Sequence, residues 1–535
     1  MSEIKNNKRA KRVSLVTRYS LLKIKNMRAL VSVSDKTGLV PFVQSLKELG
    51  WDIIATGGTM KLLQDNNIEV INISEVTGFP EICDGRVKTL HPKVHGGLLA
   101  RRDDPSHLKA LEENEINFID MVCVNLYPFR QTIAKPDVTM EDAIENIDIG
   151  GPSMLRSAAK NYKDVTVVCD PADYNRIIAE IREGGNTTVE TRLQLSAKAY
   201  THTAEYDMCI ATYMREKAGL TEKLFLEYEL AQGLRYGENP HQSAKFYRGS
   251  EEVPYSLAFA RQLHGKEMSY NNIQDANAAL SIVREFNVPF CVGLKHMNPC
   301  GAAIGKDVVE AWTKAYEADT VSIFGGIVAT NCEITLEVAQ LMKPIFLEII
   351  MAPKFAPEAL ELLQTKKNLR LIEVPMSPMT TVPMQYVSVN GGLLAQGMDL
   401  NTAEVVDSMT VTEKHATAKE LEDMNFGLRI VKHVKSNAIV VVKDGKTLGV
   451  GAGQMNRIGS AEIALKQAHA NGVTEGLVLA SDAFFPFDDC VTLANQMGVT
   501  AIVQPGGSVR DEDSIKKANE CGIAMLFSGM RHFKH

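Results

Sequence analysis

The sequence predicts an α/β protein built from two globular regions, and two observations support this prediction. Near the start of the chain, short apolar runs alternate with segments whose apolar residues recur at helical spacing. Such alternation is typical of a parallel sheet covered by helices. The same alternation resumes after about residue 225, so we place the two domains at residues 28–224 and 225–535, behind a leader of residues 1–27.

The first region begins with a predicted strand at residues 29–33, followed by Leu39, Phe42 and Leu46 at helical spacing. Further strands are predicted at residues 51–55, 68–73 and 118–124, with a helix after Thr59. A charged, helix-prone stretch, residues 216–229, joins the two regions. The leader contains eight basic residues and one acidic residue, a composition that predicts a disordered tail.

The overall composition excludes several classes of protein. A net charge of −7 argues against a chain that binds polyanions as a whole. The nine cysteines are scattered, odd in number and without a C-x-x-C pair, which argues against a disulfide framework and a thiolate zinc site. No apolar run approaches the ~18 residues that a membrane helix needs. We therefore expect a soluble cytoplasmic protein with free thiols.

Two polar turns follow the first two strands. Ser34, Lys36 and Thr37 lie in S-D-K-T-G, and Gly58 and Thr59 lie in T-G-G-T. The carboxyl ends of parallel strands meet at one edge of a sheet, where free backbone N–H groups suit an anion such as a phosphate. The alternative is simple helix capping by the side chain of Ser34 or of its neighbour.

A stretch rich in basic residues follows at residues 84–97, D-G-R-V-K-T-L-H-P-K-V-H-G-G. His91 and His95 suggest a metal pair. Pro92 argues against a helix that places both on one face, and a third ligand is missing, so we predict no metal.

Two more motifs complete the first region. Tyr127 lies before a proline in N-L-Y-P-F, and Asp148 lies in I-D-I-G-G. The helix that follows Asp148 carries Arg156 and Lys160 four residues apart, which favours an anion or carboxylate between them. A solvated basic face is the alternative.

In the second region, the loop L-R-Y-G-E-N-P-H-Q at residues 234–242 has no helical or strand period, and such loops usually serve function. A buried strand at residues 290–294 leads to Lys295 and His296. A neighbouring cation lowers the pKa of an imidazole, as a general base requires. A structural histidine beside an exposed lysine is the alternative. The dipeptide P-C at residues 299–300 matches part of a zinc deaminase motif but lacks its second cysteine, so a zinc deaminase is disfavoured.

Three later motifs follow predicted strands. Residues 322–328 are interpreted as a strand broken by two glycines, which suggests close approach of a ligand. Asp444 and Gly445 predict a hairpin after the strand at residues 438–442. The F-F-P-F run at residues 484–487 is either core or a stacking surface for a flat heterocycle.

Together these motifs resemble one family over residues 28–535, the bifunctional purine biosynthesis proteins that join phosphoribosylaminoimidazolecarboxamide (AICAR) formyltransferase to IMP cyclohydrolase. S-V-S-D-K-T-G-L, R-V-K-T-L-H-P-K-V-H-G-G, N-L-Y-P-F, I-D-I-G-G, L-R-Y-G-E-N-P-H-Q, N-P-C-G, G-A-G-Q and S-D-A-F-F-P-F occur in family order. The resemblance implies a methylglyoxal-synthase-like cyclohydrolase and a transformylase of two cytidine-deaminase-like α/β units without zinc. It also implies formyl transfer from 10-formyltetrahydrofolate to AICAR, giving FAICAR, and then ring closure to IMP with loss of water.

The resemblance assigns roles to individual residues. The implied catalytic residues are Lys88, Tyr127, Asp148 and Lys160 in the cyclohydrolase and Lys295 and His296 in the transformylase. The implied substrate-binding residues are Ser34, Lys36, Thr37, Gly58, Thr59, Arg86, Thr89, Arg235, Tyr236, His241, Asn437, Phe484 and Arg531. The implied folate-binding residues are Phe324, Glu348, Pro486 and Phe487.

The resemblance further implies a cytoplasmic homodimer that acts on small molecules, with no metal, nucleic acid or membrane as partner. Two other functions remain open from the residues. A methylglyoxal-synthase-like phosphate lyase would leave residues 225–535 unexplained. A nucleotide-sensing or nucleic-acid-binding protein would bind without turnover and depend strongly on salt.

Overall fold

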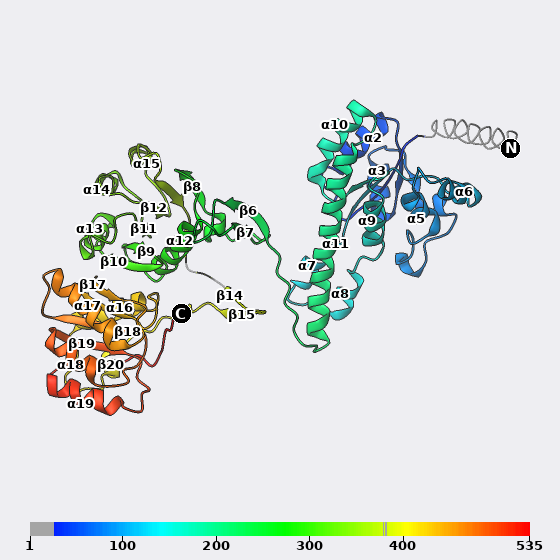
Figure 1. The fold of residues 1–535 in the computed structure, drawn as a ribbon. Helices are drawn as coiled ribbons and strands as arrows, with labels where there is room; N and C mark the ends of the chain where they lie inside the picture. Colours follow the sequence, from blue (N-terminus) through cyan, green and yellow to red (C-terminus); the bar gives the residue numbers. More distant parts are fainter. Residues whose placement is uncertain (1–25, 378, 380–381) are drawn as a thin grey trace, which may run out of the picture. The chain divides into compact units, whose positions relative to one another are not determined.

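The computed structural model describes residues 26–377, 379 and 382–535, and it divides into two compact units, Met1–Glu227 and Tyr228–His535 (Figure 1). The predicted leader lies outside the described residues except for its last two positions. The predicted domain limits of 28–224 and 225–535 stay a prediction.

The N-terminal unit contains a five-stranded sheet in the order β3-β2-β1-β4-β5, and all of its strand pairs are parallel. The parallel sheet predicted for this region is therefore confirmed. Its strands are β1 (Arg28–Val33), β2 (Asp52–Ala55), β3 (Ile71–Asn72), β4 (Met121–Asn125) and β5 (Thr166–Val168). The strands β1 and β4 are central and almost fully buried, as expected for a parallel sheet covered on both faces.

Helices cover this sheet (Figure 1). They are α2 (Leu39–Glu48), α3 (Gly57–Asp65), α4 (Ile73–Thr77), α5 (Pro92–Leu99), α6 (Pro105–Glu113), α7 (Phe129–Ile133), α8 (Met140–Glu145), α9 (Gly150–Lys160), α10 (Tyr174–Gly184) and α11 (Val189–Lys217). The expectation of a helix-prone join is wrong after Lys217, because the chain adopts a left-handed conformation at Gly219 (φ +61°) and leaves the helix.

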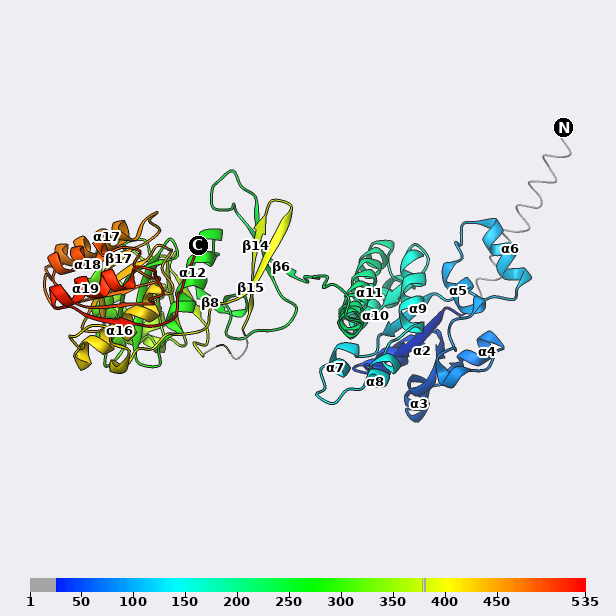
Figure 2. The same ribbon diagram turned by 90° about the horizontal axis from the view of Figure 1, so that it is seen from below.

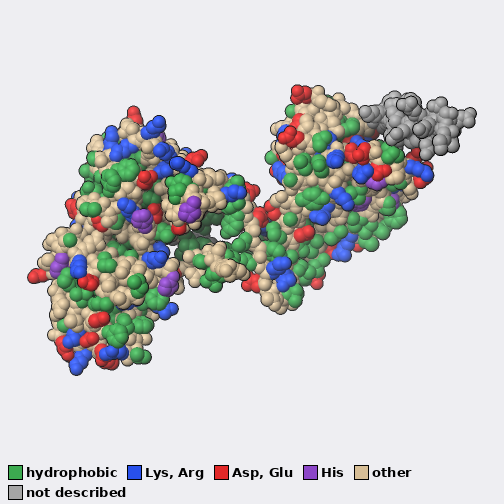
Figure 3. All heavy atoms as spheres, viewed as in Figure 1, with side chains coloured by type: hydrophobic (Ala, Val, Ile, Leu, Met, Phe, Trp, Pro, Cys, Tyr) green, Lys and Arg blue, Asp and Glu red, His purple; other side chains and the backbone are tan. Residues whose placement is uncertain are grey.

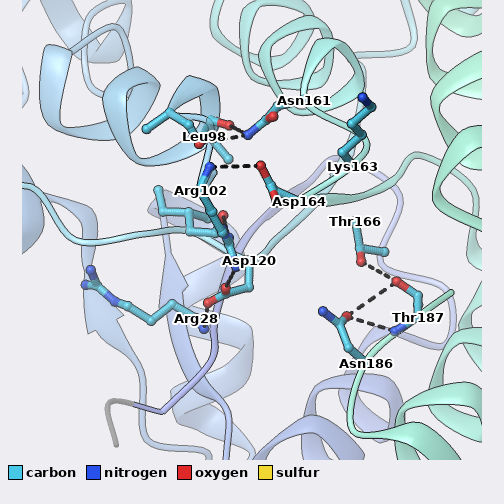
Figure 4. A network of polar contacts seen from close by, with 12 residues as sticks. Arg28, Leu98, Arg102, Asp120, Asn161, Lys163, Asp164, Thr166, Asn186 and Thr187 are labelled. Carbon is cyan, nitrogen blue, oxygen red and sulfur yellow. Dashed lines mark hydrogen bonds and ion pairs between the residues drawn. The ribbon is translucent and has the colours of Figure 1, made fainter. Parts of the chain in front are cut away.

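A polar network closes the amino-terminal end of this sheet (Figure 4). The carboxylate of Asp120 accepts the backbone N–H of Arg28 at 2.7 Å and pairs with the Arg102 guanidinium at 2.7 Å. The backbone N–H of Arg102 donates to Asp164 at 3.1 Å. These contacts tie the amino-terminal ends of β1 and β4 together, so this edge has a structural role and the opposite, carboxyl edge is left for a ligand.

The C-terminal unit contains an eleven-stranded mixed sheet in the order β20-β19-β18-β16-β17-β10-β9-β11-β12-β13-β8. Its first half consists of β8 (Arg261–His264), α12 (Tyr270–Val283), β9 (Phe290–Lys295), β10 (Asn298–Ile304), α13 (Val308–Ala318), β11 (Ile327–Thr330), α14 (Leu336–Met342), β12 (Ile349–Ala352), α15 (Pro357–Gln364) and β13 (Arg370–Glu373). Its second half consists of α16 (Ala418–Val431), β16 (Ile439–Lys443), β17 (Lys446–Gly451), α17 (Arg457–Ala470), β18 (Leu477–Ser481), α18 (Asp489–Gln496), β19 (Val499–Gln504), α19 (Asp511–Cys521) and β20 (Ala524–Phe527).

The two halves repeat one topology. Apart from β8, which precedes the repeat, each half begins with a helix, continues into an antiparallel hairpin, and then alternates helices with three strands, of which the last two pairings are parallel. The return strands β10 and β17 pair antiparallel at the centre and join the halves into one sheet. The predicted pair of α/β units is thus present.

Two short hairpins lie outside this sheet, β6 (Glu229–Leu234) with β7 (Ala244–Arg248) and β14 (Met384–Val389) with β15 (Gly392–Gly397). Figure 2 shows β14 and β15 standing away from the large sheet of their own unit. The predicted strand at residues 322–328 is wrong in its first half, because positive φ at Gly325 ends a turn there and β11 begins only at Ile327. Within the described part of the chain, no helix is long and apolar enough to cross a membrane.

Candidate functional sites at the strand ends

In the N-terminal unit, Asn125 organises the turn that follows β1. Its side-chain oxygen accepts the backbone N–H groups of Ser34 and Asp35 at 2.6 and 2.9 Å, and its amide donates to the carbonyl of Asp35 at 2.9 Å. The backbone N–H groups expected to be free at this turn are therefore satisfied. The side chains of Lys36 and Thr37 are exposed, although the Thr37 hydroxyl donates to Asp35 at 2.7 Å. The position of Asn125 at the end of β4 was a signal that sequence reasoning missed.

The turn after β2 opens the helix α3. Thr59 is buried, and its hydroxyl bridges the backbone N–H and carbonyl of Val33 in β1 at 3.1 and 3.2 Å. Thr56 accepts or donates a hydrogen bond to Ser32 at 2.7 Å, and no side chain caps α3 within the described structure. Gly57 and Gly58 are exposed at this helix start, where backbone N–H groups and the helix dipole favour an anion.

Lys88 and Asp148 approach the same strand ends. The Lys88 ammonium lies 3.3 Å from Glu81 and 3.9 Å from the position that a Cβ of Gly57 would occupy. Asp148 accepts the backbone N–H of Gly151 at 2.7 Å. Burial raises the pKa of the Asp148 carboxyl, while the backbone bonds from Gly151 and Tyr127 and the charge of Lys88 oppose that rise. A carboxyl shifted upward beside an ammonium is suited to proton transfer.

Tyr206 of α11 holds this acidic turn. Its hydroxyl accepts the backbone N–H of Asp148 at 2.8 Å and donates to the carbonyl of Asn146 at 3.1 Å. Burial raises the pKa of Tyr206 to about 12, so the hydroxyl stays protonated. No motif in the sequence pointed to Tyr206, because it lies in the middle of a long helix.

Of the remaining predicted residues of this unit, three lie near the loops of the site and one, Lys160, lies away from it. Thr89 is buried, and its hydroxyl lies 2.7 Å from where a Cβ of Gly150 would be, so it adjoins the start of α9. Arg86 and Tyr127 are exposed near the same loops, and Arg86 forms an ion pair with Glu145. Lys160 ends α9, about 15 Å along the helix from its start. No described hydrogen bond or ion pair joins Lys160 to the Lys88 and Asp148 pair.

Pro92 does not prevent a helix at the two histidines, contrary to the reasoning that it argues against one with His91 and His95 on one face. Pro92 is the first residue of α5, His91 caps the helix by accepting the Lys93 N–H at 3.1 Å, and His95 follows within the helix. Proline is favoured at a helix start because its missing N–H has no helical partner there. Both histidines line one cavity of about 610 Å³. The described residues hold no group of three or more side chains fit for a metal.

In the C-terminal unit, His296 and Met297 form the two-residue turn between β9 and β10. Lys295 pairs with Asn298 across the hairpin, and both turn residues have positive φ, +52° and +60°. Asp275 of α12 accepts the Met297 N–H at 2.7 Å and also the His296 N–H. The imidazole of His296 is exposed and, among the residues described, has no hydrogen-bond partner.

Lys295 and the two predicted folate residues of the first half occupy the same edge of the sheet. The Lys295 ammonium donates to the carbonyl of Phe324 at 2.9 Å, and the Phe324 ring is 62% exposed. Glu348 precedes β12 and forms an ion pair of 2.7 Å with the buried Arg370. Phe324 is therefore open to a ligand, whereas the Glu348 carboxylate already has a cationic partner.

Asn298 connects this edge to the second half. Its amide donates to the His296 carbonyl at 3.0 Å, and its oxygen accepts the backbone N–H of Lys435 at 3.0 Å. Two residues beyond Lys435, the side chain of Asn437 accepts from Arg457 at 2.8 Å and donates to the carbonyl of Gln454 at 2.9 Å. The His296 turn and the predicted nucleotide residue Asn437 are thereby held close together.

The last residues of the chain bind the same ends of β16 and β18. The backbone N–H of His532 donates to the carbonyl of Asp482 at 2.9 Å, which places Arg531 beside the S-D-A-F-F-P-F turn. Phe485 is fully buried, whereas Phe484, Pro486 and Phe487 are exposed. The phenylalanine run is thus one core residue with an exposed apolar face on either side.

The loop at residues 234–242 lies between β6 and β7 and touches the start of α12, where Asn271 donates to the carbonyl of Glu238 at 3.4 Å. Arg235 and His241 are exposed, and the Arg235 guanidinium lies 5.5 Å from the ring centre of Tyr236. This loop carries three predicted nucleotide contacts near the helix that supports the His296 turn.

The predicted folate-binding residues of the C-terminal unit lie in two groups that are far apart along the sheet. Phe324 precedes β11 and Phe487 follows β18, and five strand spacings lie between these strands. At about 4.8 Å each, that is about 24 Å along the sheet. The two predicted halves of the folate site are therefore not neighbours in one chain.

With a separate polar edge in each unit, the chain has the architecture of a two-site α/β enzyme.

Comparisons with known proteins identify the family. The family model "AICARFT/IMPCHase bienzyme" matches residues 158–467, and the model "MGS-like domain" matches residues 38–153. The "Bifunctional purine biosynthesis protein PurH" of Bacillus cytotoxicus is 58% identical over 510 residues, which cover 95% of this chain and 99% of that protein. Proteins of the same name from Bacillus cereus and Bacillus thuringiensis are 57% identical over the same shares.

A solved structure titled "Crystal structure of ForH" is 40% identical and covers 35% of this chain and 97% of its own, with a TM-score of 0.32. That score is too low for a comparison of folds.

The chain belongs to the AICARFT/IMPCHase bienzyme family. It is a bifunctional enzyme of purine biosynthesis with an AICAR formyltransferase and an IMP cyclohydrolase activity. The predicted methylglyoxal-synthase-like fold of the first region is confirmed by the match over residues 38–153.

Proposed function

We propose that the C-terminal unit transfers the formyl group of 10-formyltetrahydrofolate to AICAR and that the N-terminal unit closes FAICAR to IMP. The observation that carries this division is the His296 turn, which presents an exposed imidazole and the Lys295 ammonium at one sheet edge beside Asn437. The N-terminal unit offers instead an ammonium and a half-buried carboxyl near the ends of β2 and β4.

In formyl transfer, the 5-amino group of AICAR attacks the formyl carbon, the bond from that carbon to N10 of the folate breaks, and one proton passes from the amine to N10. The amine is conjugated to its ring and is a weak nucleophile. His296 acts as the general base, and the Lys295 ammonium stabilises the oxyanion or protonates the leaving nitrogen. The nucleotide is held by Arg235, Tyr236, His241, Asn437, Phe484 and Arg531, and the folate by Phe324, Glu348, Pro486 and Phe487.

In cyclisation, the carboxamide nitrogen of FAICAR attacks its own formyl carbon, and the new carbinol loses water. The cost lies in holding the reactive rotamer and in stabilising the oxyanion. Lys88 and Tyr127 stabilise the charge, and Asp148 with Lys160 orients or deprotonates the amide. The nucleotide phosphate binds at the open start of α3 with Ser34, Lys36, Thr37, Gly58, Thr59, Arg86 and Thr89.

A homodimer is part of this proposal. The strands beside Phe324 and Phe487, β11 and β18, lie about 24 Å apart in one chain, which is too far for one pterin, so a second chain supplies the missing wall of the folate site. The β14–β15 hairpin supports pairing, because Met384, Val387, Val389, Leu393 and Leu394 are all at least 40% exposed there. Such an apolar ribbon is typical of a surface that another chain covers.

The partners and compartment follow the same proposal, with small molecules as substrates, no nucleic acid, no membrane, no metal requirement and a cytoplasmic location. Figure 3 shows acidic and basic side chains interspersed on the visible face of both units, which disfavours a nucleic-acid surface. The nine cysteines are free, and those of β4 and β9 are buried, which suits a reducing compartment.

The decisive experiment is to mix the purified protein with AICAR and 10-formyltetrahydrofolate and to follow IMP. We expect IMP to form. His296→Ala should abolish formyl transfer and spare the cyclisation of supplied FAICAR, while Lys88→Ala should let FAICAR accumulate. Near-normal transfer by the His296 variant, or unchanged IMP output by the Lys88 variant, would remove that residue from its role.

A further inference from the structure

The His296 turn has a structural counterpart in the other half of the C-terminal unit. In the second half, Asp444 and Gly445 form the two-residue turn between β16 and β17, again with positive φ, +55° and +65°. A spacing of 148 residues separates His296 from Asp444 and also Asp275 from Asp423. The two turns are therefore equivalent positions of the repeat.

The same carboxylate supports both turns. Asp423 of α16 accepts the backbone N–H groups of Asp444 and Gly445 at 3.0 and 2.7 Å, as Asp275 of α12 does for His296 and Met297. Asp275 and Asp423 are each the sixth residue of their helix. The bond pattern therefore belongs to the repeat and is not a local accident of one loop.

The two turns differ in how well their residues suit the backbone. Asp-Gly is among the sequences most favoured in a two-residue hairpin whose residues both need positive φ. His-Met is not, because the second position holds Met297, whose side chain opposes that conformation, where the other turn has glycine. The first half thus forces an unfavourable turn whose imidazole is exposed at the sheet edge.

We propose that Asp275 is a positioning residue for formyl transfer, holding the His296–Met297 turn in the left-handed conformation that presents the imidazole. The inference rests on the proposed role of His296. The hydrogen bonds of Asp275 to the turn go to its backbone N–H groups, and the carboxylate charge also acts on the His296 side chain. Asp275 therefore acts through His296, by setting where its imidazole lies. Asn298 holds the other side of the turn through the His296 carbonyl.

The test uses the full-length enzyme and a rescue. Asp275→Ala should lower kcat for formyl transfer about 100-fold, the loss expected when a reacting group is misplaced by about 1 Å. KM for AICAR should change far less, and cyclisation of FAICAR by the same chain should be unchanged. Adding Met297→Gly should restore kcat at least about tenfold, because glycine adopts positive φ without support. Met297→Gly alone should leave formyl transfer near normal.

Asp423→Ala is the matched control. It removes the equivalent carboxylate from the equivalent turn, so it should lower the melting temperature while kcat for formyl transfer at 25 °C stays within about threefold. Equal losses of kcat in the two aspartate variants, a normal kcat in Asp275→Ala, or no rescue by Met297→Gly would each overturn the inference. If His296→Ala itself transfers formyl groups normally, the proposed function fails; if that variant is inactive and Asp275→Ala is normal, only this inference fails.

Discussion

The two halves of the C-terminal unit have one topology, yet only the first presents an exposed imidazole at its hairpin turn. The likeness extends to side chains. Lys295 donates to the carbonyl of Phe324 at 2.9 Å, and Lys443, 148 residues later, donates to the carbonyl of Glu475 at 2.8 Å. Gly325 and Gly476, the residues after these carbonyls, both have positive φ. A lysine bound to a carbonyl is thus part of the scaffold.

The two halves differ in the side chains of the turn residues, His296 and Met297 in the first half and Asp444 and Gly445 in the second. Asp444 forms an ion pair with Lys419, so the second turn is satisfied within its own half. His296 has no such partner among the described residues and is exposed. With the proposed role of His296, the first half carries a less favourable turn on the frame that both halves share, as expected where strain is concentrated at functional sites.

The largest effect is expected when the first turn is given the sequence of the second. His296→Asp combined with Met297→Gly should lower formyl transfer by about 10²–10⁴-fold, the usual contribution of a general base. The melting temperature should not fall, because Asp-Gly suits positive φ at both positions. Formyl transfer and thermal unfolding measured on the same preparation check both statements. A stable variant that still transfers formyl groups would contradict the functional difference between the halves.

The next largest effect is expected on stability, at an ion pair between Glu285 of the first half and Lys432 and His433 of the second, in which Glu285 and His433 are equivalent positions of the repeat. Glu285 follows α12 and His433 follows α16, and the Glu285 carboxylate pairs with the buried Lys432 at 2.7 Å and with His433 at 2.9 Å. Glu285→Gln leaves Lys432 without its counter-ion, so the free energy of unfolding should fall by about 3–5 kcal/mol at neutral pH. Denaturant unfolding measures this.

The pH dependence of that effect has a definite sign. Burial alone would raise the pKa of Glu285, but His433 and Lys432 outweigh it and lower the pKa to about 2. A depressed carboxyl stabilises the fold above its ordinary pKa of 4.5, and this stabilisation is lost as the pH falls from there through about 2. The difference between wild type and Glu285→Gln should therefore shrink over that range. A constant difference would show that the charge is not what matters.

Much of the fold followed from apolar spacing, since β1, β2 and β4 and the parallel pairing of the first sheet depend on short buried runs. The strand predicted at residues 322–328 begins five residues too early, because the turn that ends at Gly325 and the close approach of Gly326 to Leu294 are not visible in the apolar spacing. The residues that the motifs singled out lie mostly at or near strand ends, as the alternation of elements predicted, and their roles stay predictions. Asp275 and Tyr206 were missed because they act through backbone groups distant in sequence, and such contacts leave no local pattern.

A smaller effect is expected at the glycine of the second turn. A Cβ at Gly445 would lie 2.6 Å from Ile304 and would sit at φ +65°, so Gly445→Ala should destabilise the protein by about 1–3 kcal/mol. Formyl transfer at 25 °C should be unchanged. Met297, at the equivalent position, carries a side chain that is 39% exposed and has room. If thermal unfolding shows no loss of stability in Gly445→Ala, the second turn has as much room as the first, and the packing difference between the two turns is wrong.

The smallest effect is expected for Lys443→Met, and comparing it with Lys295→Met distinguishes a structural hydrogen bond from a catalytic charge. Lys443→Met removes a single hydrogen bond to the Glu475 carbonyl, worth about 0.5–1.5 kcal/mol. Its formyl-transfer kcat should stay within about threefold of wild type. Lys295→Met removes the equivalent bond to Phe324 and also the ammonium beside the reacting atoms, so kcat should fall at least about 100-fold at a similar cost in stability. The two variants lose the same hydrogen bond to a carbonyl, so the ratio of their kcat values reports what the Lys295 ammonium adds to catalysis. A ratio near one would mean that Lys295, like Lys443, has only a structural role.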